Sequence, residues 1–235
     1  MIVIQGNINL NKKFNMKYCI NILFLIFFTI SPAVVFAQHF VFKPSQLRLF
    51  WKDARGIPFL SFSNVRKEHP NLVFMMNAGM YTASNNPAPV GLYVENGVKL
   101  RPVNIVINKK VNYGISPSGI FYFNAQKAHI IKAKDWSNQI NAKYATQSGP
   151  MLLIEGVVNR NLPKGSYIKR NGVGVRADGK VIFACFRSNF IDFAVWFKNQ
   201  KCTNALYLDG GISDYWTPNT LFSIGKFGPI IGAVE

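Results

Sequence analysis

Short apolar runs that end in turn-forming residues recur along most of this chain, and they most constrain what it can fold into. Residues 72–76 and 205–208 are four- or five-residue apolar runs that stop abruptly at a polar side chain. Two hairpin signatures, Glu95-Asn96-Gly97 and Asp178-Gly179, separate further pairs of runs, because Asn-Gly and Asp-Gly accept the backbone angles of tight turns. The pattern predicts many short strands joined by hairpins.

One stretch has helical periodicity instead. Phe190, Phe193 and Phe197 recur at i, i+3 and i+7, and Asn189 stands where a helix would be capped. The aromatic stripe is expected to pack into the core. The fold class predicted from these patterns is α+β: a single β-rich domain of mixed or antiparallel sheets with a few helices.

The N-terminus has the pattern of a secretory signal peptide. Three lysines precede a run of apolar residues, and small residues lead up to Ala37. We expect residues 1–37 to be a signal peptide and residues 38–235 the mature domain, exported to the periplasm or the extracellular space. An uncleaved anchor is the alternative. No transmembrane segment is expected after cleavage.

The chain is strongly basic, with 27 Lys and Arg against 10 Asp and Glu and a formal net charge of +17. The basic residues are densest between positions 160 and 187, which favours an anionic ligand there. Nucleic acid would exploit the same charge, but the predicted export and the placement of most aromatic residues in apolar runs argue against it.

Two cysteines, Cys185 and Cys202, follow the predicted signal peptide. An oxidising compartment permits a disulfide between them, and two buried thiols are the equal alternative. A cysteine nucleophile is disfavoured, because Cys185 lies in an apolar run where burial would raise its pKa.

Most carboxylates are explained as turn or loop residues, among them Glu68 in a polar connection, which leaves Asp209 and Asp214 as candidates for catalysis. Asp209 follows an apolar run and precedes Gly210 and Gly211. The glycines allow a ligand to approach the backbone closely while the carboxylate projects from the strand end.

The same construction occurs twice more, at Asn77 with Gly79 and at Ser148 with Gly149. Polar residues beside glycine at strand ends can gather one site from distant parts of a chain. Arg170 precedes a Gly-Val-Gly run and is predicted to grip a phosphate with its guanidinium.

Other chemistries have weaker support in the sequence. A Ser/His triad lacks the nucleophile-elbow pattern around Ser148, and the Cys and His spacings are not those of a zinc site. No cofactor is required by the sequence, and a divalent cation held by Asp209 and backbone oxygens remains open.

Five motifs in order, each weak alone, resemble the phosphodiester glycosidase family. They are Asn77-Ala78-Gly79-Met80, Pro89-Val90-Gly91-Leu92, Gln147-Ser148-Gly149-Pro150-Met151-Leu152, Arg170-Asn171-Gly172-Val173-Gly174 and Leu206-Tyr207-Leu208-Asp209-Gly210-Gly211. The resemblance implies an enzyme that hydrolyses the glycosidic C–O bond of a sugar-1-phosphodiester and releases a phosphomonoester. The positions that match the family are Asn77, Gly79, Ser148, Gly149, Arg170, Asp209, Gly210 and Gly211. Ala78 and Ile212 depart from glycines found in some members, so the substrate is not transferable.

In this hypothesis Asp209 acts at the anomeric carbon, as nucleophile or as base for water, and Arg170 holds the phosphate. Asn77 and Ser148 orient substrate oxygens, while Asp214 supports Asp209 or acts as a second carboxyl. The substrate would be a sugar phosphate or an anionic glycopolymer. Two alternatives stay open: a non-catalytic module that binds anionic cell-envelope glycopolymers, and a phosphodiesterase that cuts the P–O bond.

Overall fold

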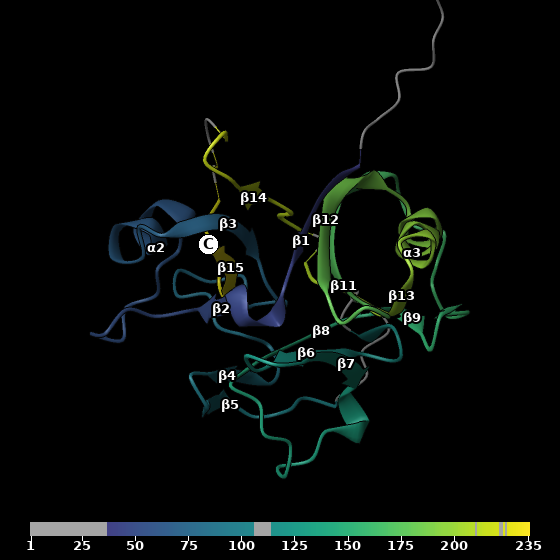
Figure 1. Ribbon diagram of the computed structural model, residues 1–235, viewed down its shortest axis with the longest axis horizontal. Helices are drawn as coiled ribbons and strands as arrows, with labels where there is room; N and C mark the ends of the chain where they lie inside the picture. The colour runs from purple at the N-terminus through teal and green to yellow at the C-terminus, as the bar shows by residue number, and fades with distance from the viewer. Residues whose placement is uncertain (1–36, 106–113, 210, 221–222, 224) are drawn as a thin grey trace, which may run out of the picture. The chain divides into compact units, whose positions relative to one another are not determined.

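The computed structural model describes residues 37–105, 114–209, 211–220, 223 and 225–235 (Figure 1). Its strands make three sheets in which every recorded strand pair of the described residues is antiparallel. The predicted signal peptide lies outside the described residues except for Ala37, and it stays a prediction.

The largest sheet has six strands and carries one helix. Its order is β1 (Gln38–Phe42), β12 (Val181–Ser188), β11 (Ile168–Arg176), β13 (Cys202–Tyr207), β9 (Met151–Ile154) and β10 (Val157–Val158). The helix α3 (Phe190–Asn199) packs on β9 and β13 (Figure 1). A side chain at Gly172 or Gly174 of β11 would collide with the α3 residue Phe197 or its neighbours, so these two glycines let the helix approach the sheet.

A four-stranded sheet holds both an early and a late part of the chain. Its order is β14 (Tyr215–Trp216), β3 (Leu72–Asn77), β15 (Ile230–Val234) and β2 (Leu47–Phe50). The helix α2 (Phe62–Glu68) contributes Phe62 and Val65 to an apolar cluster with residues of this sheet. Because β15 pairs with both β2 and β3, this late strand joins the two early ones.

The third sheet has five strands. Its order is β5 (Val98–Arg101), β4 (Tyr93–Glu95), β8 (Tyr144–Ser148), β6 (Gly119–Phe123) and β7 (Ala128–Lys132). Two short 3-10 helices, η1 (Pro44–Gln46) and η3 (Ala133–Asp135), lie outside the sheets. All three sheets share one apolar core, to which they contribute Phe74, Phe121 and Leu206 among others. Strand ends from different sheets are thereby brought close together.

The β-rich α+β class is confirmed, and its sheets are antiparallel rather than mixed. The predicted helix is α3, capped by the Asn189 side chain, which accepts the Asp192 N–H over 2.9 Å. The β4–β5 hairpin turns through positive φ at Asn96 and Gly97, as its Asn-Gly pair predicts. The helix α2 was not predicted, and Glu68 is its last residue rather than part of a loop. With only seven residues, α2 is too short to show a periodicity.

Cys185 and Cys202 are both free and buried. They belong to different apolar clusters: Cys185 lies in the core shared by the sheets, and Cys202 in the cluster beneath α3. In the part of the chain that the structure describes, no helix has the length and hydropathy needed to span a membrane.

Candidate active site

The backbone around Asp209 is fixed by side chains from two neighbouring strands. Asp209 lies two residues past the end of β13, and its N–H donates to Oδ1 of Asn171 over 2.9 Å. The preceding Leu208 N–H donates to the Asn171 carbonyl over 3.1 Å, and the Ser148 hydroxyl donates to the Leu208 carbonyl. The sequence thus ends a buried strand at Asp209 and holds that end against β11 and β8.

The Asp209 carboxylate is held by donors on both oxygens. Asn77 donates from Nδ2 to Oδ2 over 3.1 Å, and the Gly211 N–H donates to Oδ1 over 3.2 Å. The Tyr81 phenol lies near Asp209, and its hydroxyl donates to the Lys226 carbonyl over 3.2 Å. Burial, followed by the nearby Asp209, raises the pKa of Tyr81 well above its usual value. Tyr81 therefore stays protonated beside the carboxylate.

Two buried asparagines connect the parts of this cluster. Asn171 donates from Nδ2 to the Asn77 carbonyl over 2.8 Å and to Asn77 Oδ1 over 3.0 Å. Asn77 Oδ1 also accepts the Asp214 N–H over 2.9 Å. Both asparagine side chains are fully buried. Because an amide offers two donor hydrogens and an acceptor oxygen, this pair can tie β3, β11, Asp209 and Asp214 to one another.

A cation and a second carboxylate lie next to the asparagine pair. Lys169 Nζ donates to Asp214 Oδ1 over 3.0 Å, and the Ser223 hydroxyl donates to Oδ2 over 2.8 Å. Burial acts to lower the pKa of Lys169, but Cys185 and the charge and hydrogen bond of Asp214 outweigh it, so the pKa is raised. The Lys169 side chain is still 46% exposed, so its ammonium can meet an anionic ligand.

Arg170 points away from this cluster, because successive side chains of a strand face opposite sides of the sheet. It is 1% exposed, and its guanidinium donates to the carbonyls of Ser188 and Ser166 and to the Tyr207 hydroxyl. It also lies 3.8 Å from the centre of the Phe190 ring. These contacts make Arg170 part of the packing beneath α3, and the phosphate-binding role predicted for it does not fit this environment.

The glycines of the predicted site have varied environments. Gly79 and Gly149 are buried, and Gly79 packs its backbone against β8, where its N–H donates to Thr146 Oγ1 over 3.2 Å. Gly211 is exposed beside Asp209, and Gly210 lies outside the described residues. The structure therefore brings Asn77, Asp209 and Gly211 together with Asp214. Ser148 supports the neighbouring backbone through its bond to the Leu208 carbonyl.

Lys169, Asn171, Tyr81, Ser213 and Ser223 belong to the cluster but were not singled out from the sequence. Ser213 donates to the Asp209 carbonyl over 2.7 Å. Strand alternation along β11 could have identified Lys169 and Asn171, because they share a face of the sheet and Arg170 does not. Ser223 carries no comparable signal, since it reaches Asp214 from a loop.

The described residues contain no group of three or more His, Cys, Asp and Glu side chains that could hold a metal ion. The carboxylates of Asp209 and Asp214 are instead bonded to amide, ammonium and hydroxyl donors. What the cluster offers chemically is a positioned carboxylate next to a phenol and an amine.

The fold and the site together define an α+β domain that gathers polar groups at the ends of strands from different sheets. Residues 70–220 match the family described as phosphodiester glycosidase, and the chain belongs to that family. It is also similar to the uncharacterized protein YigE of Escherichia coli (strain K12), with 31% identity over 194 residues, 78% of this chain and 75% of that protein.

Two solved structures share the fold at low sequence identity. The zebrafish N-acetylglucosamine-1-phosphodiester alpha-N-acetylglucosaminidase catalytic domain, auto-inhibited by its pro-peptide, has a TM-score of 0.61 at 12% identity over 87% of this chain and 85% of that one. A Burkholderia pseudomallei K96243 protein, provisionally named an exported protein, has a TM-score of 0.55 at 12% identity over 84% of this chain and 73% of that one.

Proposed function

We propose that this protein hydrolyses sugar-1-phosphodiesters by breaking the glycosidic C–O bond. Water supplies its oxygen to the anomeric carbon, the phosphomonoester leaves with the bridging oxygen, and a free sugar is released. The observation that carries the proposal is the Asp209 carboxylate, held by Asn77 at the end of β13 in a member of this family.

One catalytic carboxylate suits this reaction. Ordinary glycosidases pair two carboxyl groups because an alkoxide leaving group needs a proton from a general acid. A phosphomonoester leaves as a stabilised anion, so the site needs mainly a group at the anomeric carbon and a positive charge near the phosphate. Asp214 does not have to supply an acid, which agrees with its bonds to Lys169 and Ser223.

We assign the phosphate-binding charge to Lys169 in place of Arg170. Lys169 is the partly exposed cation on the face of β11 that also carries Asn171. Asp214 holds the ammonium in place, and Asn77 links the Asp214 backbone to the Asp209 carboxylate. The amine and the carboxylate are therefore connected through one asparagine, an arrangement that would place the phosphate and the anomeric carbon of one substrate side by side.

The Asp209 carboxylate can act in either of two ways. It can attack the anomeric carbon and form a glycosyl ester that water then opens, or it can take a proton from water as the water attacks. In both routes Tyr81 stays protonated beside the carboxylate and adds no second negative charge there.

The decisive experiment is hydrolysis of UDP-N-acetylglucosamine and of an N-acetylglucosamine-1-phosphoryl sugar by wild type and by Asp209→Asn. Wild type is expected to release free sugar, with and without a chelator, and the variant is not. Running the reaction in oxygen-18 water distinguishes the bond that breaks, because C–O cleavage puts the label in the sugar and P–O cleavage puts it in the phosphate.

Two other outcomes would replace the proposal. Label in the phosphate would identify a phosphodiesterase. Salt-sensitive, saturable binding of anionic glycopolymers without any product, unchanged in Asp209→Asn, would identify a binding module.

We also propose that the protein is exported and that its mature chain begins at Gln38. The N-terminal sequence pattern supports this, as does the fold shared with a protein provisionally named exported. N-terminal sequencing of the protein isolated from periplasm or medium tests it, and a chain that keeps residues 1–37 there would contradict it.

A further inference from the structure

A cavity lies at the opposite edge of the four-stranded sheet from the Asp209 cluster. It has a volume of about 420 Å³ and shares no lining residue with the cluster. In this sheet the cluster engages β3 and β14, whereas the cavity is lined by β2, the strand at the other edge. Its volume is in the range of pockets that bind small molecules.

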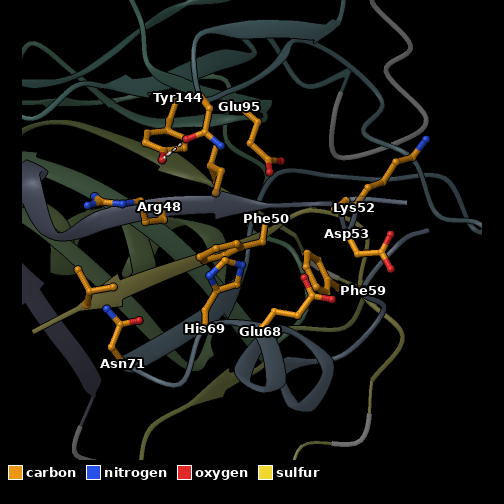
Figure 2. A pocket seen from close by; sticks show the side chains of 14 residues that line it. Arg48, Phe50, Lys52, Asp53, Phe59, Glu68, His69, Asn71, Glu95 and Tyr144 are labelled. Atoms are coloured by element: carbon orange, nitrogen blue, oxygen red, sulfur yellow. Dashed lines mark hydrogen bonds between the residues drawn. The ribbon is translucent and has the colours of Figure 1, made fainter. Parts of the chain in front are cut away.

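Aromatic rings form one part of the cavity wall. The rings of Phe50 and His69 lie 4.6 Å apart between centres, and Phe59 meets His69 edge-on at 6.3 Å. Figure 2 shows Phe50 in the middle of the cavity lining, with Tyr144 and Glu95 on one side and His69 on the other. Phe50 and Phe59 are buried, at 7% and 5% exposed, so the partly exposed His69 ring packed against them is the aromatic surface that a ligand can reach.

Polar groups of both kinds surround these rings. Glu68 and Glu95 supply acceptor oxygens, and Asn71 and Asn96 supply amides. Burial raises the pKa of Glu95, which also accepts the Tyr93 hydroxyl over 2.7 Å. Acceptors and donors are thus interleaved around an aromatic surface.

The lining carries two cations, Arg48 and Lys52, against three carboxylates, Asp53, Glu68 and Glu95. Most of these charges already have a partner. Asp53 is bound by Arg55 over 2.8 Å. Arg48 donates to two backbone carbonyls, and Lys52 lies over the Trp51 ring at 4.3 Å. Because Arg55, outside the lining, offsets Asp53, the two lining cations Arg48 and Lys52 match Glu68 and Glu95 in number. A ligand with a net charge, or with separate charged ends, would therefore find no concentrated opposite charge here.

We propose that this cavity binds a neutral pyranose unit of a glycan, at a site separate from Asp209. A pyranose has hydroxyls around its rim for carboxylate and amide groups, and apolar C–H faces for the His69 ring, which Phe50 and Phe59 support from behind. In an enzyme that acts on a glycan-linked phosphodiester, a second sugar site would hold the polymer near the active site and raise the local substrate concentration.

The test is an NMR titration of the isotope-labelled protein with methyl glucoside and methyl N-acetylglucosaminide, neither of which is a phosphodiester. Saturable shifts are expected in the backbone amides of Glu68, His69, Asn71 and Asn96. Choline, inorganic phosphate and glycine serve as cationic, anionic and zwitterionic probes, and none of them should produce these shifts.

Truncation of the polar lining should weaken the sugar binding. Glu68→Ala combined with Asn71→Ala is expected to raise the Kd about tenfold, as expected for loss of a hydrogen bond to a charged group. Glu155→Ala, another exposed glutamate in the distant β9–β10 turn, is the matched control. Asn71→Ala alone is measured as well, in case the double variant disturbs α2.

Three results would overturn the proposal. They are no shift with either sugar, shifts confined to residues around Asp209 and Gly211, or cavity shifts produced by a charged probe and not by the sugars. None of these results depends on catalysis. The sugar site can therefore be disproved while the proposed hydrolysis stands, and the hydrolysis can be disproved while the sugar site stands.

Discussion

The amide nitrogen of Asn77 donates to the Asp209 carboxylate over 3.1 Å, and the two residues are 132 positions apart in the chain. This bond joins the end of β3 to the end of β13, and so one sheet to another. Asn171 holds both partners through its own side chain. The geometry of the carboxylate therefore depends on an amide pair that never needs to touch a substrate.

Asn171→Ala should lower both stability and activity. The substitution leaves the Asn77 carbonyl and the Asp209 N–H without their partner, and we expect the free energy of unfolding to fall by about 2 to 4 kcal/mol. The kcat should fall as well, because the strand end that carries Asp209 loses its anchor. Urea unfolding and steady-state kinetics measure the two effects. Asn161→Ala, which removes an exposed asparagine bonded to Ser116, should change neither.

Lys169→Gln should weaken catalysis with little effect on folding. The pair with Asp214 is partly exposed, so its loss is expected to cost at most about 1 kcal/mol of stability. Loss of the phosphate-binding charge should lower kcat/KM for a phosphodiester substrate by about tenfold or more. Kinetics at several salt concentrations would measure it. An unchanged kcat/KM would remove Lys169 from the proposed mechanism.

Arg170→Lys should lower the stability of the fold and leave catalysis largely unchanged, the reverse of the effect expected for Lys169→Gln. A lysine ammonium cannot make the three hydrogen bonds that the guanidinium donates to Ser188, Ser166 and Tyr207. We therefore expect the free energy of unfolding to fall by about 2 kcal/mol. The activity of the folded protein should be retained. Arg187→Lys, at an exposed arginine bonded to Tyr167, is the matched control. Full stability with lost substrate binding would restore the phosphate role for Arg170.

Gly79→Ala should destabilise the contact between β3 and β8. The added Cβ would overlap the Gln147 carbonyl oxygen and lie 2.5 Å from Thr146 Oγ1, and such overpacking costs about 1 to 3 kcal/mol. Thermal unfolding measures the loss. At Gly211 the nearest atom to an added Cβ is 3.9 Å away, so Gly211→Ala should unfold like wild type.

Stability should decline in alkaline solution partly through Cys185. Burial, moderated by the nearby Lys169, raises the pKa of this thiol from 9.0 to about 12. The unfolded chain loses the proton first, so the contribution is complete below about pH 9 and is lost as pH rises through about 12, at roughly 1 kcal/mol per pH unit. Urea unfolding across this range should give a shallower decline for Cys185→Ala, and identical slopes would contradict the assignment.

Much of the fold could be predicted from local patterns, because the hairpins and the α3 helix are each specified by a few adjacent residues. The placement of Asn77 and Asp209 could be anticipated for the same reason, because both are polar residues at the ends of apolar runs. The orientation of Arg170 could not be predicted from charge alone, since its environment depends on which face of β11 receives α3. The Gly-Val-Gly run beside it accommodates Phe193 and Phe197 of that helix rather than a ligand.

The position of β15 between β2 and β3 also sets an order of events during synthesis. Ile230 pairs with Phe50 on one side and with Asn77 on the other, so the sheet that carries Asn77 cannot close until this late segment has emerged. A chain still on the ribosome lacks β15, so β2 and β3 cannot join into one sheet before this segment is synthesised. The sheet that carries Asn77, and with it the position of the Asp209 carboxylate, is therefore completed late in folding.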